Sequence, residues 1–119
     1  MARHLITALA ALFATGNMAS AETPFGLEPV ATLERPWAMA ALPEGGFLVI
    51  EKAGRLVHVA ASGEVTAIAG VPAVTDDGQV GLHDVALAPD FATSGLVYLT
   101  WVDGERGGAL HLGRGRLDL

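Results

Sequence analysis

Short apolar segments, each ended by a glycine- or proline-containing turn, recur along most of this sequence. Segments of four to nine residues with β-branched members and frequent turn residues favour antiparallel strands over helices. The pattern therefore predicts an all-β chain with loops at 74–80 and 88–95. The expected strands cover residues 37–42, 47–51, 55–59, 65–68, 82–87, 96–102 and 109–117.

Two parts of the chain share one plan, an apolar strand, a proline-acidic turn and a second apolar strand, at an offset of about 45 residues. That period suits the four-stranded blade of a β-propeller, and the alternative is one small sandwich or barrel. Propellers close with four to eight blades, whereas this chain has room for about two. The second unit ends after its third strand, at Leu119. We therefore expect a partial β-propeller of about two antiparallel blades.

Residues 1–21 have the features of a secretory signal peptide. Arg3 and His4 form a short polar start, an apolar run follows, and Ala19-Ser20-Ala21 is a small-x-small cleavage pattern. We expect cleavage between Ala21 and Glu22, and a periplasmic or secreted mature domain of residues 22–119. The apolar run is shorter than the roughly 20 residues that a spanning helix needs, so no stable membrane insertion is expected.

Composition excludes several classes of function. The chain has no cysteine, which removes disulfide scaffolds, zinc-cysteine modules and thiol redox enzymes. Its formal net charge is −6, and duplex-DNA binding depends on clustered lysine and arginine. The Gly-Arg-Gly-Arg segment of residues 113–116 has two arginines in an acidic chain, too few for RNA binding. No nucleic-acid partner is expected.

Six segments together resemble one known family. They are RPWAMAALP (35–43), FLVIEKAGRL (47–56), GVPAV (70–74), DGQVGLHDVALAPDF (77–91), LVYLTW (96–101) and GRGRLD (113–118). From Leu33 to Asp118 the chain is similar to the glucose/sorbosone dehydrogenases, which are soluble aldose sugar dehydrogenases that depend on pyrroloquinoline quinone (PQQ). Each segment alone is common in β-propellers, and the combination is specific.

The resemblance implies a six-bladed propeller that binds PQQ and calcium above its central channel. Such an enzyme oxidises the anomeric hydroxyl of an aldose to a lactone and passes electrons to an external acceptor. The family's catalytic histidine, and most of its cofactor and calcium ligands, lie downstream of the aligned region. We therefore expect an N-terminal fragment, inactive alone, with no catalytic residue and no metal ligand in this chain.

Gln79 is the one residue that matches a functional position of the family, where a glutamine helps to line the sugar pocket. A glutamine amide both donates and accepts hydrogen bonds, which suits a sugar hydroxyl. Asp76-Asp77-Gly78-Gln79 is also a good turn sequence. Val80 and His83 depart from the family, which usually has a small or polar residue and a leucine there.

Other candidates have simpler structural explanations. His83-Asp84 resembles a base with its orienting carboxylate, but neighbouring strand residues point to opposite faces. Trp37 and Trp101 are expected to pack between sheets rather than stack on a sugar. Neither the histidines nor the acidic residues have a known metal-site spacing, so we assign the carboxylates to solvated loops and turns. The residues considered for a metal site are the histidines His58, His83 and His111 and the aspartates Asp76, Asp77, Asp84 and Asp90.

Two other functions remain open from the sequence. A small non-enzymatic periplasmic β-module that binds carbohydrate or protein is the first alternative. Two-blade units of that kind can close a ring by symmetric assembly, which buries their open edges. A propeller hydrolase or lactonase is a more distant possibility, because its metal carboxylates are not recognisable here.

The signal-peptide interpretation predicts the first residue of the exported protein. N-terminal sequencing of material secreted by a bacterial host is expected to begin at Glu22, because signal peptidase cuts after the small-x-small motif. A mature product that still begins at Met1 would contradict it.

Overall fold

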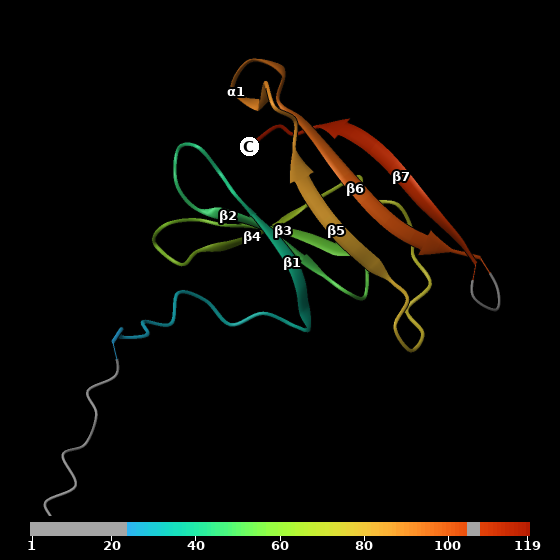
Figure 1. Cartoon of the computed structure of the whole chain (residues 1–119), viewed down its shortest axis with the longest axis horizontal. Coiled ribbons are helices and arrows are strands. Elements are labelled where there is room, and N and C mark those ends of the chain that lie inside the picture. Colours follow the sequence, from blue (N-terminus) through green and yellow to red (C-terminus); the bar gives the residue numbers. More distant parts are fainter. Residues whose placement is uncertain (1–23, 105–107) are drawn as a thin grey trace, which may run out of the picture.

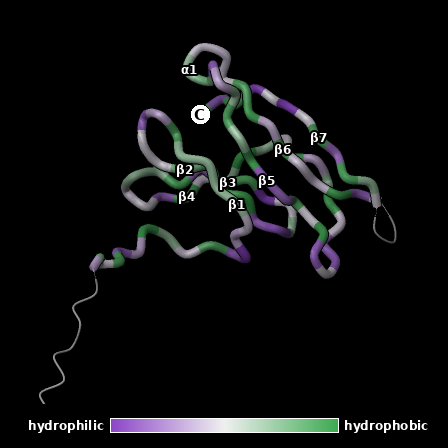
Figure 2. Tube along the Cα trace, in the orientation of Figure 1, coloured by the Kyte–Doolittle hydropathy of each residue, from purple (hydrophilic) through white to green (hydrophobic). Residues whose placement is uncertain are grey.

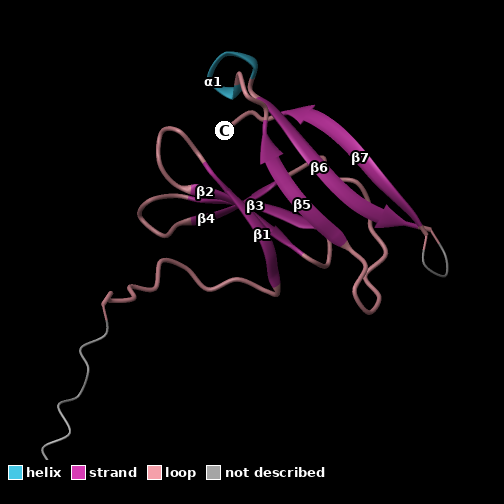
Figure 3. Ribbon diagram, in the orientation of Figure 1, coloured by secondary structure: helices cyan, strands magenta, loops and turns pink. Residues whose placement is uncertain are grey.

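The computed structural model describes residues 24–104 and 108–119. The predicted signal peptide and its cleavage site lie outside the described residues. Two antiparallel sheets and one short helix make up the regular structure (Figures 1 and 3). In the described part of the chain the sheets do not close into a barrel, and no helix is long and apolar enough to cross a bilayer.

The first sheet is a complete four-stranded meander. It runs in the order β1 (Pro36–Ala41), β2 (Phe47–Glu51), β3 (Arg55–Val59) and β4 (Val65–Ile68), each strand antiparallel to the next. The predicted strands are confirmed, with β1 beginning and ending one residue earlier than expected. The tight turn between β1 and β2 needs glycine at Gly46, where φ is 80° and an added Cβ would lie 2.6 Å from the Val59 carbonyl oxygen.

The second sheet has three strands among the described residues. Its order is β5 (Leu82–Leu87), β6 (Leu96–Asp103) and β7 (Ala109–Arg116), again antiparallel. The prediction of an all-β partial propeller is therefore confirmed, with one sheet of four strands and one of three.

The segment after β5 corrects one prediction. Residues 91–94 were expected in a loop and instead form a one-turn helix, α1 (Phe91–Ser94). The Ser94 hydroxyl donates to the Asp90 carboxylate at 3.0 Å, and Gly95 ends the helix at φ 64° with its N–H on the Phe91 carbonyl. A single turn held by its ends has no apolar periodicity that a sequence pattern can reveal.

The two repeated units also share an irregularity in strand pairing. The pairing of β1 with β2 shifts between Pro36 and Ala38, and that of β5 with β6 shifts between Leu82 and Asp84. Each shift lies near the start of the first strand of its sheet. Because of the second shift, Leu82 and Val85 are both buried in the same core although they are three residues apart.

An apolar core joins the two sheets. Leu48, Ile50 and Leu56 of the first sheet pack with Leu82, Val85 and Val97 of the second, and Leu42 completes this inter-sheet core. β5 lies against β1, so the first strands of the two sheets are neighbours (Figure 1). Alternation along β2 and β3 gives the first sheet a second apolar face, where Leu33 of the irregular lead-in packs near Val49 and Val57.

Apolar side chains are also exposed on the outer face of each sheet. Trp37 and Met39 lie on that of the first sheet, with 47% and 57% exposed, and Leu110 and Leu112 lie on β7. Trp37 does not pack between the two described sheets as expected, since it lies on the same outer face as Met39, two residues further along β1. For Trp101 the same expectation is confirmed, since it packs against the inter-sheet core.

The inter-sheet core predicts a contrast between two leucine truncations. Leu48→Ala removes a fully buried side chain and is expected to lower the free energy of unfolding by about 2–5 kcal/mol. Leu112→Ala, on the exposed face of β7, is expected to change it by less than about 0.5 kcal/mol. Urea denaturation of both variants checks this, and equal losses would mean that the core lies elsewhere.

Candidate functional site

Polar turns from both sheets meet at one end of the molecule. They are the turn between β2 and β3, the loop of residues 75–81 that leads into β5, and the start of the β6–β7 connection. The loop is the hydrophilic stretch that projects beyond the apolar strands in Figure 2. This end is the candidate site, because it holds Gln79.

Backbone hydrogen bonds fix both ends of this loop. At one end the Thr75 N–H donates to the Val102 carbonyl at 2.8 Å, and the Thr75 hydroxyl donates to the Gly104 carbonyl at 2.7 Å. At the other end Gly81 accepts from the Val102 N–H at 3.0 Å, and the Leu82 N–H donates to the Lys52 carbonyl at 2.9 Å. The loop is thereby fixed to both sheets.

Asp76 forms ion pairs with two cations from the first sheet. Lys52 Nζ and the Arg35 guanidinium both donate to its carboxylate. The Lys52 side chain is only 6% exposed, whereas that of Arg35 is largely in solvent. The assignment of Asp76 to a merely solvated loop is therefore wrong, because its carboxylate neutralises a buried ammonium group.

The two cations also set the titration of Asp76. The hydrogen bond from Lys52, and to a smaller extent the one from Arg35, holds the pKa of the Asp76 carboxyl below its ordinary value. Because the pKa of Asp76 is lower in the folded state, its ion pairs stabilise the fold fully at pH values above the ordinary carboxyl pKa. This stabilisation is lost as the pH falls through the pKa of the folded state. The ion pairs are thus complete at neutral and mildly acidic pH.

Glu51, the last residue of β2, forms further polar contacts at the β2–β3 hairpin. Its carboxylate is buried, accepts from the Arg55 guanidinium at 2.6 Å and accepts from the Glu34 N–H at 2.8 Å. The residue after Glu34, Arg35, has φ 48°, a left-handed conformation that residues other than glycine seldom adopt. The Arg35 carbonyl accepts from the Lys52 N–H at 3.1 Å, which holds the entry to β1 against the hairpin.

Gln79 lies at the exposed tip of the loop. Asp77 and Val80 form a bridge that closes a turn around Gly78 and Gln79, with the Val80 N–H donating to the Asp77 carbonyl at 2.8 Å. Gly78 has φ 52°, so it takes the left-handed position of this turn. The amide of Gln79 is exposed to solvent and is thus accessible to a ligand at this end.

The other sequence candidates are dispersed. The Asp84 carboxylate accepts from the Val85 N–H at 2.8 Å. His111 Nε2 lies 2.7 Å from an Asp103 carboxylate oxygen, and its ring stacks on Trp101 with centroids 5.2 Å apart. Among the described residues, no three His, Cys, Asp or Glu side chains are grouped so that they could hold a metal ion.

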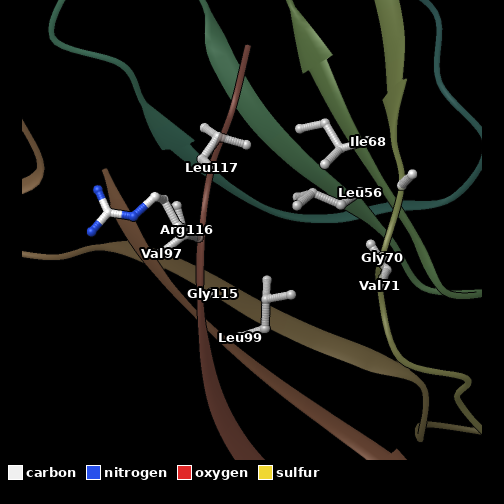
Figure 4. Close-up of a pocket in the computed structure, with 10 residues that line it drawn as sticks. Leu56, Ile68, Gly70, Val71, Val97, Leu99, Gly115, Arg116 and Leu117 are labelled. Atoms are coloured by element: carbon white, nitrogen blue, oxygen red, sulfur yellow. The ribbon is translucent and has the colours of Figure 1, made fainter. Parts of the chain in front are cut away.

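An apolar crevice of about 110 Å³ lies between the sheets, away from Gln79. Its walls include Leu56 and Ile68 on one side and Leu99 and Leu117 on the other (Figure 4). Arg116 directs its guanidinium away from the opposite wall (Figure 4). With few polar groups to orient a substrate, the crevice is a packing feature between two sheets rather than a polar site.

The described residues do not by themselves fit PQQ or calcium. PQQ carries three carboxylates, and the cations described at this end, Lys52, Arg35 and Arg55, are already paired with Asp76 or Glu51. Calcium takes six to eight oxygen ligands, and the carboxylates described here are not grouped for a metal ion. At this end Gln79 is an exposed group whose amide can both donate and accept a hydrogen bond with a sugar hydroxyl.

Comparison with known proteins places the chain in a family. The family model of glucose/sorbosone dehydrogenase matches residues 33–119. The chain belongs to the glucose/sorbosone dehydrogenase family. It is similar to the aldose sugar dehydrogenase YliI of Escherichia coli K12, with 43% identity over 88 residues that cover 69% of this chain and 24% of that protein.

Solved structures of this family show the same arrangement of strands. The PQQ-bound aldose sugar dehydrogenase of Streptomyces coelicolor is 33% identical, with a TM-score of 0.68, and the match covers 74% of this chain and 26% of that one. The apo form of the Escherichia coli soluble aldose sugar dehydrogenase is 41% identical, with a TM-score of 0.67 over 72% of this chain and 26% of that one. The chain thus spans about a quarter of the length of these relatives.

Sequence reasoning missed the ion pairs at this end. Lys52 lies in the β2–β3 turn and Asp76, 24 residues later, lies in the loop before β5, so no local spacing connects them. The available signal was the pair Glu51-Lys52, two charged residues directly after an apolar strand and before a tight turn. That signal indicates a polar strand end but names no partner.

The close contact between Gly81 and the hairpin predicts a steric effect. A Cβ at Gly81 would lie 2.3 Å from the Lys52 carbonyl oxygen and 2.9 Å from Lys52 Cγ. Gly81→Ala is therefore expected to lower the free energy of unfolding by about 1–3 kcal/mol in urea denaturation.

Gly115→Ala is the matched control, because an added Cβ there has no heavy atom within 4 Å and the residue has ordinary strand geometry. It is expected to leave stability unchanged or slightly higher. A loss for Gly115→Ala as large as that for Gly81→Ala would contradict the contact.

Proposed function

We propose that this chain is part of an enzyme that oxidises the anomeric hydroxyl of an aldose to a lactone with PQQ as cofactor. Family membership, and a PQQ-bound relative of the same strand arrangement, support the reaction class. In this oxidation the sugar loses two electrons and two protons. If bound, PQQ would accept the two electrons and two protons, and its reoxidation would pass the electrons to an external acceptor and release the protons.

The observation that carries the proposal is the placement of Gln79. Gln79 is exposed at the tip of a loop that is fixed at both ends, and the family resemblance matches it to the glutamine that helps to line the sugar pocket. An amide that donates and accepts can fix one hydroxyl of a sugar in both position and direction. Such orientation is how binding groups lower the barrier for a reaction at a neighbouring carbon.

Several further parts of this proposal depend on the family resemblance. Calcium accompanies the cofactor, and most ligands of both belong to segments downstream of the aligned region. Export to the periplasm follows from the signal peptide, with cleavage between Ala21 and Glu22. Because the catalytic histidine also belongs downstream, residues 22–119 alone are proposed to be inactive toward aldoses.

A chimaera tests the proposed function. Residues 33–119 replace the matching segment of the Escherichia coli aldose sugar dehydrogenase, which is 43% identical over 88 residues. The chimaera, loaded with PQQ and calcium, is expected to reduce an electron-accepting dye with aldoses. Gln79→Ala in the chimaera is expected to lower kcat/KM by about 10- to 100-fold, the effect of one lost hydrogen bond to the sugar.

Glu44→Ala is the matched control, because Glu44 is exposed in the β1–β2 turn at the opposite end of the first sheet. It is expected to leave kcat/KM unchanged. A folded chimaera that binds PQQ but oxidises no aldose, or a Gln79→Ala variant as active as its parent, would refute the proposed function.

A further inference from the structure

Lys52 is a buried cation whose charge has one partner among the described side chains. Its side chain is 6% exposed, and Nζ donates to the Asp76 carboxylate. A buried ammonium group is stable only when a counter-charge stays within hydrogen-bonding distance. The position of Asp76 is therefore restricted by Lys52 more strongly than by Arg35, whose side chain is 58% exposed.

The path of the Lys52 side chain is also fixed. It crosses Gly81, where an added Cβ would lie 2.9 Å from Lys52 Cγ, and the Lys52 carbonyl accepts from the Leu82 N–H. Lys52 thus contacts the segment of Gln79 on both sides, at Asp76 before it and at Gly81 and Leu82 after it. Between these contacts the Asp77–Val80 bridge closes the turn at Gly78 and Gln79.

We propose that Lys52 is a positioning residue. Through its ion pair with Asp76, it holds the loop of residues 76–80, and with it Gln79, in one position relative to the two sheets. This inference rests on the proposed function, because it assigns Lys52 a role in sugar oxidation through Gln79. Lys52 itself does not touch the sugar. The lowered pKa of Asp76 agrees with a pair that stays ionised at working pH.

Hydrogen exchange in the full chain tests the positioning directly. Lys52→Met keeps the length and packing of the stem but removes the charge, and Asp76→Asn removes the counter-charge. In both variants the amides of residues 76–80 are expected to exchange at least about 10-fold faster, while those of β2 and β6 are unchanged. Arg55→Met, which breaks the ion pair with Glu51 in the same hairpin, is the control and is expected to leave residues 76–80 unchanged.

Exchange also separates positioning from general stability. Unchanged exchange of residues 76–80 in Lys52→Met would overturn the proposal. So would equal acceleration across β2, β5 and β6 in both variants, because the pair would then stabilise the whole fold rather than the loop. Both outcomes are independent of any enzymatic activity.

A double-mutant cycle in the chimaera then links the position to the reaction. Lys52→Met is expected to lower kcat/KM about 10-fold when Gln79 is present and to have no further effect in the Gln79→Ala background. Additive losses would overturn a role through Gln79. If the parent chimaera or Gln79→Ala refutes the proposed function, the exchange result still decides whether Lys52 holds the loop.

Discussion

The apolar surface shared by the two sheets is the constraint on which the rest of this structure depends. Leu48, Ile50 and Leu56 of the first sheet are buried in one cluster with Leu82, Val85 and Val97 of the second. The same packing places β5 against β1 and so carries the preceding loop to the β2–β3 hairpin. The polar end of the molecule, with Gln79 at its tip, is thus a consequence of how two apolar faces meet.

Each sheet also presents an apolar face that the described chain leaves partly open. Trp37 and Met39 on one side, and Leu110 and Leu112 on the other, continue the alternation that produces the inter-sheet core. A fold that buries every sheet between two neighbours, as a propeller does, uses both faces of each blade. This explains why a chain spanning about a quarter of its relatives carries apolar side chains on both outer faces.

Strand positions were predictable because short apolar runs and glycine or proline turns are local signals. All seven predicted strands are present, and every strand end lies within one residue of its predicted position. Apart from the single turn of α1, what the sequence did not reveal depends on contacts between distant segments. The strand irregularities at Trp37 and His83 follow from pairing with β2 and β6. Lys52 is buried because Asp76 and Gly81 lie against it. Neither the irregular strand pairing nor this burial produces a periodic pattern in the sequence.

Methyl-methyl nuclear Overhauser effects show whether one apolar core joins the two sheets. With selectively labelled Ile, Leu and Val methyl groups, a shared core gives cross-peaks that connect Ile50 and Leu56 of the first sheet to Val85 and Val97 of the second. Cross-peaks confined to each sheet, with none between these two groups in a folded sample, would contradict it. The loop that carries Gln79 would then have no fixed place relative to the hairpin.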